Sequence, residues 1–220
     1  MSKSLAKYDR IDAVDADLLW SAACTAYRIN GGYLKVPQKE GDKIVKPTNR
    51  EIVTIALYDH SLITDADRDH AKACRKYMAS SVTINALKGT LSEWGQITAR
   101  ICQLDKITSQ YDLSVITAMP QSEFKARQRD TVDGRLAQCI PGSVGKVGDR
   151  VELEAEIVRN AYSSKFNTWF VTAITRGNFA VHFAYRESIA SGTQAKITGT
   201  VKRHNDRSTQ LNRVKMEVLA

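Results

Sequence analysis

The chain is 220 residues long, 43% hydrophobic and 25% charged, which is the balance of an ordinary globular protein. This length suits one large domain or two small ones with a proper core. No stretch approaches the ~18 apolar residues of a membrane span, and the N-terminus lacks the apolar core of a secretion signal. We therefore expect a cytoplasmic protein with no membrane segment.

The net charge of +8, with a pI near 9.3, is unevenly distributed along the chain. Residues 143–220 hold 12 basic and 7 acidic side chains, whereas the longer segment 1–142 holds 20 and 17. A basic surface on a small domain is typical of proteins that bind a polyanion. Solubility alone is the competing explanation for this charge.

The cysteines are widely spaced, and no two of them form a C-x-x-C pair. This spacing indicates neither a disulfide framework nor a zinc ribbon. We expect four reduced thiols, packed as small apolar groups, at Cys24, Cys74, Cys102 and Cys139.

Three segments imitate functional motifs, and each lacks an essential residue. Gly142–Lys146 resembles a phosphate loop but lacks both the earlier glycine and the Ser or Thr that follows the lysine. Asp65–Asp69 begins like a calcium loop, but His70 stands where glycine must make the turn. His70 and Cys74 have a metal-compatible spacing, with only His60 nearby as a third ligand. We predict no catalytic residue, no metal and no cofactor.

In chain order, the first helices are predicted from their start and stop signals. Asp15 is expected to cap a helix that ends at about Asn30, before Gly31–Gly32. Thr48–Glu51 has the pattern of a capping box, which begins a helix through about Tyr58.

Between these two helices the sequence predicts a β-hairpin. Tyr33–Val36 and Lys43–Lys46 flank the turn-forming segment Gln38–Asp42. Its lysines are a candidate secondary phosphate contact, with a solvated loop as the alternative explanation. They are Lys35, Lys39, Lys43 and Lys46.

Two more helix starts follow the hairpin. Thr64–Asp67 begins a helix that reaches about Met78, and Thr90–Glu93 is a capping box before apolar residues at helical spacing. Leu113–Met119 fits a strand and a buried helical turn equally well.

A polar segment after Pro120 is expected to be helical as far as Cys139. Pro141–Ser143 is the predicted hinge between two domains. The first domain therefore covers residues 1–142 and the second covers residues 143–220.

Beyond the hinge, five short segments alternate between apolar and polar residues, with turn signals between them. Five strands with a short insert between the third and fourth suit an OB-like barrel, a fold that commonly binds oligonucleotides. The predicted fold class is α+β: a helical N-terminal domain with a small hairpin, then a five-stranded antiparallel OB-like β-barrel. The predicted strands are Val151–Ile157, Asn167–Thr175, Phe179–Tyr185, Ala195–Lys202 and Gln210–Val218.

In an OB-like barrel the ligand lies across the second and third strands, between the first-to-second and fourth-to-fifth loops. The predicted loops Asn160–Phe166 and Arg203–Ser208 both combine cations with planar side chains, the mixture that single-strand binding needs. The candidate nucleic-acid-binding residues are Arg159, Tyr162, Lys165, Phe166, Trp169, Arg176, His182, Lys202, Arg203, His204, Arg207, Arg213 and Lys215.

Alternation on the last two strands predicts which side chains point outward. Lys202 on the fourth strand is expected outside, as are Leu211, Arg213 and Lys215 on the fifth. Because these strands are neighbours in a closed barrel, the three cations are predicted to form one basic stripe.

The same alternation assigns the rings of the barrel. Phe170, Phe179 and Phe183 are predicted in the core, because a small barrel must fill its interior. Trp169 and His182 have the opposite parity and are predicted on the outer face.

Two loop rings, Tyr162 and Phe166, are the first choices for stacking on bases, with packing against the barrel mouth as an equal alternative. Glu152, Glu154 and Glu156 form an acidic outer face on the first strand. We expect a ligand to avoid that face, or the acids to face the helical domain.

The segment Gly199–His204, followed by Thr209–Lys215, resembles the closing strands of OB-type domains in bacteriophage replication and single-strand-binding proteins. Thr168–Val171 and Phe179–Phe183 have a similar pattern upstream. The resemblance covers about residues 144–220. It implies a viral protein that acts on DNA in the host bacterial cytoplasm, in replication or recombination.

Fold, charge and resemblance together predict a non-enzymatic protein whose barrel binds single-stranded DNA with little sequence preference. Residue spacing does not separate DNA from RNA. The helical domain is expected to provide contacts to a protein partner or self-association. The alternative is a phage structural or interaction module, such as a virion component or an inhibitor of a host protein, whose barrel binds protein.

Overall fold

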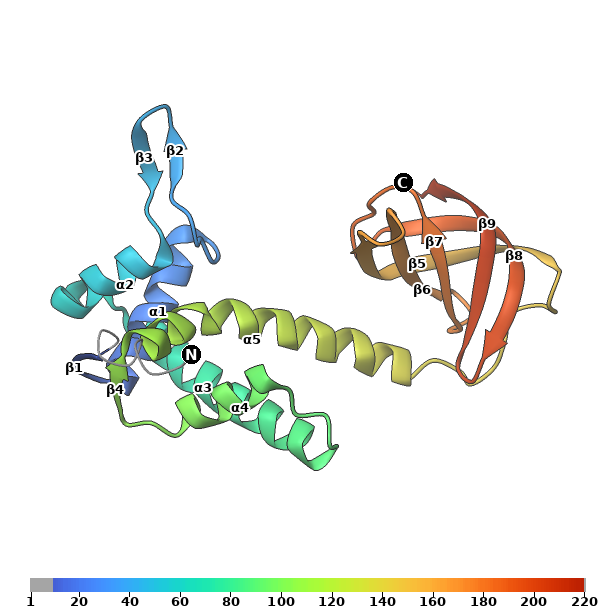
Figure 1. Ribbon diagram of the computed structural model, residues 1–220. Coiled ribbons are helices and arrows are strands. Elements are labelled where there is room, and N and C mark those ends of the chain that lie inside the picture. The colour runs from blue at the N-terminus through green and yellow to red at the C-terminus, as the bar shows by residue number, and fades with distance from the viewer. Residues whose placement is uncertain (1–9, 220) are drawn as a thin grey trace. The chain divides into compact units, whose positions relative to one another are not determined.

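The computed structural model describes residues 10–219, and its backbone is drawn in Figure 1. Internal contacts divide the chain into unit 1, Met1–Arg127, and unit 2, Gln128–Ala220. Unit 1 is mainly helical and unit 2 contains a closed five-stranded β-barrel, so the fold is α+β as predicted. None of the helices in the described part of the chain combines the length and the apolar character needed to cross a membrane.

Unit 1 is built from helices and two small antiparallel sheets, one pairing β1 with β4 and the other pairing β2 with β3. The β1–β4 sheet was not predicted, because both strands are short and pair with a partner far away in the sequence. The elements are β1 (Arg10–Asp15), α1 (Ala16–Asn30), β2 (Gln38–Glu40), β3 (Lys43–Lys46), α2 (Asn49–Tyr58), the 3-10 helix η2 (His60–Leu62), α3 (Asp65–Leu87), α4 (Glu93–Cys102), β4 (Lys106–Ser109) and the start of α5 (Gln110–Ala137).

The predicted signals of the first helix are confirmed. The carboxylate of Asp15 accepts a hydrogen bond of 2.9 Å from the Leu18 amide, as an N-cap does. The helix ends at Gly31, whose φ of 66° is left-handed and therefore costs glycine less than any other residue.

The capping predictions for later helices have mixed outcomes. The box of Thr48 and Glu51 begins α2, with both reciprocal hydrogen bonds present. The box predicted at Thr90–Glu93 is wrong: Ser92 caps α4, and its hydroxyl accepts from the Gly95 amide. Thr64 caps α3 at its start, as predicted, but the helix continues beyond Met78 to Leu87.

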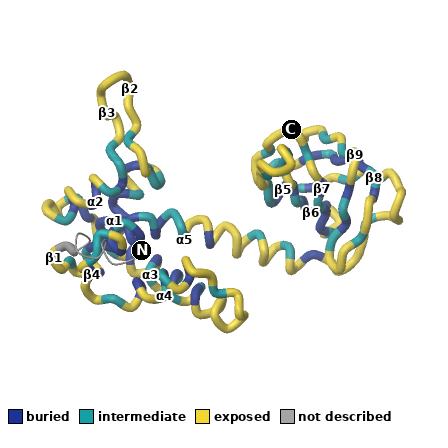
Figure 2. The backbone as a smooth tube through the Cα atoms, in the orientation of Figure 1, coloured by how far each residue is buried: buried dark blue, intermediate teal, exposed yellow. Residues whose placement is uncertain are grey.

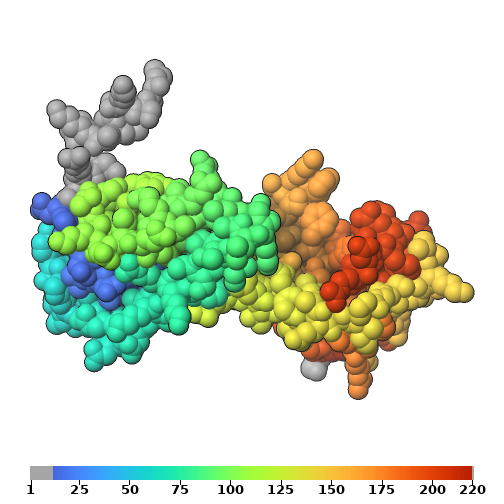
Figure 3. All heavy atoms as spheres, turned by 90° about the horizontal axis from the view of Figure 1, so that it is seen from below, coloured from blue at the N-terminus to red at the C-terminus, as the bar shows by residue number. Residues whose placement is uncertain are grey.

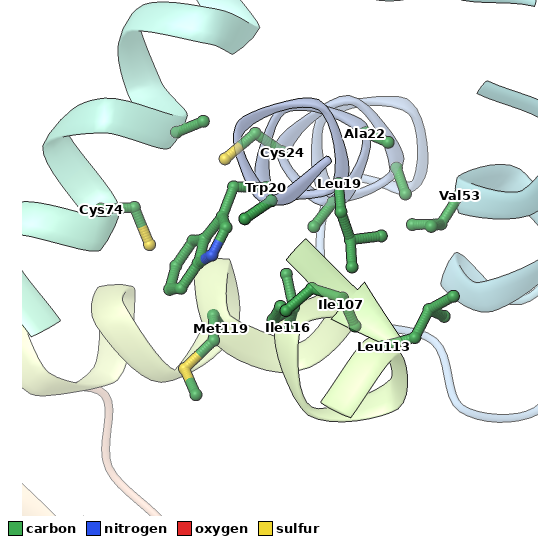
Figure 4. Close-up of a cluster of buried hydrophobic side chains, with 14 of the residues drawn as sticks. Leu19, Trp20, Ala22, Cys24, Val53, Cys74, Ile107, Leu113, Ile116 and Met119 are labelled. Atoms are coloured by element: carbon green, nitrogen blue, oxygen red, sulfur yellow. The ribbon is translucent and has the colours of Figure 1, made fainter. Parts of the chain in front are cut away.

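The core of unit 1 gathers around one indole. Trp20 and Leu19 of α1 are fully buried against Ile107 of β4 and Ile116 and Met119 of α5 (Figure 4). The segment 113–119, whose sequence fits a strand and a helical turn equally well, is helical, and its apolar residues face this core. Helix α5 continues through Pro120, which lies within it.

All four cysteines are buried free thiols, which agrees with the prediction of reduced cysteines. Burial raises the pKa of Cys24 to about 12 and that of Cys102 to about 11. Because the thiolate is the reactive form, these thiols are packing groups rather than nucleophiles.

The predicted hairpin is present, but its first strand is Gln38–Glu40 instead of Tyr33–Val36. It pairs with Lys43–Lys46 across a tight turn at Gly41 and Asp42. Every residue of both strands is exposed, as the yellow tube in Figure 2 shows.

The barrel of unit 2 closes in the order β5-β6-β7-β9-β8, with β8 also paired to β5. All neighbours are antiparallel except β7 and β9, so the prediction of a purely antiparallel barrel is wrong. An odd number of strands cannot close with alternating directions throughout, and one parallel pair is therefore required. The strands are β5 (Arg150–Ser163), β6 (Thr168–Thr175), β7 (Ala180–Tyr185), β8 (Gln194–Asn205) and β9 (Ser208–Val218).

One bulge on β9 changes which side chains face inward. Arg213 has a φ of 50°, and the pairing shifts where Thr200 faces Asn212 while Thr198 faces Lys215. Leu211, predicted outside, is therefore buried in the barrel core. Gly199 lies beside this bulge, and a Cβ there would come within 3.3 Å of the Asn212 carbonyl oxygen.

The last turns of α5 belong to unit 2 and are bonded to the barrel. The Arg135 guanidinium donates to both carboxylate oxygens of Glu156, at 2.8 and 2.9 Å. The amide of Ile140 donates to the Asn178 carbonyl at 2.9 Å. The predicted hinge at 141–143 consequently lies inside unit 2.

Candidate nucleic-acid interface

One row of outward side chains crosses all five strands of the barrel. Register pairs Arg159 with Thr172, Thr172 with His182, His182 with Gln210, and Gln210 with Arg203. Thr172, His182 and Gln210 each lie between two buried residues of their strands, and alternation therefore turns these three side chains outward. Arg159 and Arg203 share their face, because they pair with Thr172 and Gln210. At the spacing of neighbouring strands the row extends for roughly 20 Å. We call these five residues the cross-strand row.

Two aromatic residues exchange the positions that alternation predicted for them. Trp169 is in register with Tyr162 and Tyr185 and packs against the barrel core, so its predicted outward position is wrong. Phe170, predicted in the core, is 45% exposed and is the next outward residue on β6 after Thr172. The run 168–174 is apolar on both faces, and period-2 alternation therefore gave no clear parity.

The outer face of the β5–β6 hairpin presents two rings and a cation. Phe166 is 61% exposed and meets Phe170 edge to face, with centroids 6.0 Å apart. The Lys165 ammonium lies 5.4 Å from the Phe166 ring centroid. Phe166 is thus available for stacking, and Phe170 is a candidate that the sequence did not identify.

Tyr162 lies on the opposite face of the same hairpin from Phe170. Its ring contacts Trp169, with centroids 5.2 Å apart, and its hydroxyl donates to Asn167 at 2.7 Å. Tyr162 is still half exposed, but it caps the barrel mouth, which was the alternative interpretation of this residue. Tyr162 and Phe166, which were both predicted to stack on bases, therefore lie on different faces of the hairpin.

Three predicted cations already have partners within unit 2. Arg159 is ion-paired with Asp133 of α5, and Arg176 is 3.1 Å from Glu154. Arg207 donates to the carbonyl of Ala137 at 2.8 Å. A polyanion must displace these contacts, or share the cation with them, to bind these arginines.

The acidic face of β5 is largely neutralised by neighbouring cations. Glu152 is 2.7 Å from Lys196, and the carboxylates of Glu154 and Glu156 are paired with arginines. Glu156 contacts the end of α5, one of the two outcomes expected for these acids. The Arg135 hydrogen bonds are the main reason that the pKa of Glu156 lies below its ordinary value.

His182 occupies the centre of the cross-strand row. The Asn205 side chain lies 3.3 Å from its Nε2, and Arg203 is close enough to repel a proton from the ring. Burial first, and the charge of Arg203 second, hold the pKa of His182 below its ordinary value. The ring is therefore neutral at neutral pH.

Beside His182, the row contains an unused acceptor. The Oε1 atom of Gln210 is buried and accepts no hydrogen bond from the described residues.

The basic stripe predicted on the last two strands is present in part. Lys202 and Lys215 are exposed, and Lys215 faces Thr198 on the outer side of the β8–β9 ribbon. Arg213 is exposed at the bulge, and none of the three has an ion pair with a described residue. The space-filling view shows atoms of this ribbon, in red, at the surface (Figure 3). His204 is not in the stripe, because its Nδ1 lies 3.2 Å from buried Thr209.

The predicted secondary lysines lie in unit 1, on or beside the β2–β3 hairpin, where all four are exposed. Lys46 donates to the carbonyl oxygen of Asn30 at 3.4 Å.

Within residues 10–219, no group of three His, Cys, Asp or Glu side chains is arranged to hold a metal ion. The His70 ring is instead 3.4 Å from Glu123. Comparison of the chain with models of protein families, with curated proteins and with solved structures gave no match.

Proposed function

We propose that the protein binds single-stranded nucleic acid, with DNA as its ligand, through the cross-strand row and the rings of the β5–β6 hairpin. The observation that carries this proposal is the row itself, in which two arginines flank a histidine, a threonine and a glutamine in register across five strands. The row favours a linear ligand that crosses the strands.

The strand order supports an OB-like assignment for the barrel. Three consecutive strands are followed by a fourth that returns to the first, and the fifth closes the barrel between the third and fourth. In barrels of this type the second and third strands, with two flanking loops, bind oligonucleotides. Here those strands are β6 and β7, which contribute Thr172 and His182 to the row.

The chemistry of the face fits the sugar-phosphate backbone and the bases separately. Arg203, Lys202 and Lys165 are available to neutralise phosphates, and the rings of Phe166 and Phe170 are available to stack on bases. Neither contact reads the identity of a base, so we expect little sequence preference. No reaction is required of the protein, which acts by holding the strand exposed for phage replication or recombination.

Fluorescence anisotropy with a labelled oligonucleotide of about 20 nucleotides tests the proposal. Removing a cation that neutralises one phosphate should lower the slope of log K against log salt by ~0.7 for a single strand. Replacing Lys202, Arg203 and Arg213 by alanine should therefore weaken binding across all sequences and reduce that slope. The matched control replaces Lys76, Lys88 and Lys125, exposed lysines of unit 1, by alanine.

Equal behaviour of the two triple variants contradicts the barrel as the binding site. No binding by the native protein at moderate salt favours the alternative, a barrel that binds protein. Competition with an RNA oligonucleotide of the same sequence shows which sugar the site prefers.

A further inference from the structure

The β2–β3 hairpin of unit 1 is a two-stranded ribbon that covers no core. Lys39 faces Ile44 and Glu40 faces Lys43 across the ribbon, and the side chains of both strands are exposed. An isolated hairpin is only marginally stable in water, and this one buries almost no apolar surface. The stability of unit 1 therefore does not explain why the ribbon is present.

The base of the ribbon is held by a buried amide network. Asn49 is fully buried, and its Oδ1 accepts from the Leu34 amide and from Asn30 Nδ2, both at 2.8 Å. Its Nδ2 donates to the Gly32 carbonyl at 3.0 Å, and Asn30 Nδ2 donates to the Pro47 carbonyl at 3.0 Å. The segments that enter and leave the ribbon are thus tied to each other and to the start of α2.

The ribbon has one face without an acidic side chain. Lys39 and Ile44 lie opposite each other on one face of the ribbon, whereas the register shift next to Lys39 places Lys46 on the other face, paired with Gln38. Glu40 and Lys43 lie on the other face, and Asp42 is in the turn. The first face therefore presents one ammonium group beside a branched apolar side chain.

The absence of aromatic rings on the ribbon favours duplex DNA over a single strand as its ligand. Residues 36–46 contain no Phe, Tyr or Trp, so bases of a single strand have no ring to stack on. A two-stranded β-ribbon does fit the major groove of a duplex, which is about 12 Å wide. Lysines at its margins can reach phosphates, and an apolar side chain can contact a thymine methyl group.

We propose that the β2–β3 hairpin is an arm that lies in the major groove of duplex DNA. The face of Lys39 and Ile44 is turned to the base edges, while Lys35 and Lys43 contact the flanking phosphates. The Asn30–Asn49 network keeps the arm extended, which lowers the entropy that binding must remove. This activity is separate from the barrel and does not rest on single-strand binding.

The test uses the full chain and a labelled blunt duplex of about 20 base pairs, titrated from about 50 to 200 mM salt. The arm variant carries Lys35→Gln, Lys39→Gln and Lys43→Gln. The control carries Lys76→Gln, Lys88→Gln and Lys125→Gln, which remove the same charge elsewhere in unit 1. The arm variant should bind the duplex about tenfold more weakly, and its log–log salt slope should fall by ~0.9 for each phosphate that it no longer neutralises.

Three outcomes overturn the arm. These are a native protein that does not bind the duplex at about 50 mM salt, an arm variant that matches the control, and equal weakening of single-strand and duplex binding by the arm variant. Unchanged single-strand binding by the arm variant, together with weakened duplex binding, supports it. The barrel variant, with Lys202, Arg203 and Arg213 replaced, is measured with single strands only. A failure of the barrel proposal is therefore distinguishable from a failure of the proposal that the hairpin binds duplex DNA.

Discussion

Phe166 and Phe170 meet edge to face at 6.0 Å on the outer side of the β5–β6 hairpin, although one belongs to the loop and the other to the strand. Both rings are largely exposed, and Phe170 is the neighbour of Thr172 on the outer face. An exposed pair of phenylalanines next to a polar row is costly in water unless a ligand covers it.

Replacing either ring tests this pair directly. Phe166→Ala and Phe170→Ala should each weaken binding of a single strand by ~1–3 kcal/mol, because each removes one stacking surface. Phe124→Ala, which removes an exposed ring from unit 1, is the control and should leave the affinity unchanged. Anisotropy gives the affinities, and circular dichroism checks that the barrel remains folded. Affinities equal to that of the control would exclude stacking on these rings.

The ion pair between Arg159 and Asp133 makes a second prediction. Asp133→Asn removes the carboxylate that competes with phosphate for this guanidinium, so single strands should bind more tightly. The pair is partly exposed, which limits the gain to about 0.2–1 kcal/mol. Asp65→Asn in unit 1 makes the same change of charge and serves as the control. If both substitutions have the same effect on affinity, Arg159 does not contact the strand.

The lowered pKa of His182 predicts that binding depends on pH. In the free protein, burial and Arg203 keep the ring neutral, whereas a bound phosphate would favour its protonation. Binding should therefore take up a proton and strengthen as the pH falls from about 8 to about 6. His182→Gln should lose this part of the pH dependence, as measured by anisotropy at several pH values. A variant with the native pH profile would place the responsible group elsewhere.

The ion pair between buried Asp67 and half-exposed Arg28 predicts acid sensitivity in unit 1. The Asp67 side chain is 4% exposed; burial raises its pKa, but hydrogen bonds from Arg28, Thr64 and Thr25 outweigh burial and lower the pKa to about 2. The pair therefore contributes stability that is complete above the unfolded pKa of about 4 and is lost as the pH falls to about 2. We expect a loss of about 2 kcal/mol across that range.

Urea unfolding of the native protein and of Asp67→Asn measures this loss. The substitution should lower the free energy of unfolding near pH 7 by about 2 kcal/mol, because it weakens the charge-assisted hydrogen bonds that Arg28 and Thr64 donate to the buried carboxylate. It should also flatten the decrease toward acid pH. A variant that keeps the native acid sensitivity would show that other carboxylates are responsible.

The parts of the fold that sequence could predict are those with local causes. Asp15, Gly31 and the Thr48 box act within a few residues of themselves, and the structure confirms each of them. The five barrel segments were recognisable because alternation is also local. Lys106–Ser109 was missed, since a strand of this length is fixed only by its distant partner β1.

The candidate site was harder to predict, because it depends on which residues of each strand point outward and which point into the barrel. A single extra residue at Arg213 moves Leu211 into the core, and the apolar run before Thr175 conceals that Phe170 faces outward. The row from Arg159 to Arg203 results from register between strands that are far apart in the sequence. His182 and both arginines were identified as candidates, but their alignment was not.

A closed barrel with an odd number of strands must contain a parallel pair, which here is β7 and β9. The β7–β9 pairing has four register pairs, from Ala180 with Ser208 to Phe183 with Leu211, the fewest in the barrel. Beyond this joint a groove lies between Tyr185 and Met216. The barrel should therefore open first between β7 and β9, and amide hydrogen exchange in the barrel should be fastest along this pairing. A nucleic-acid strand bound over His182 and Gln210 would contact both β7 and β9. The ligand would therefore stabilise the shortest strand pairing of its own binding site.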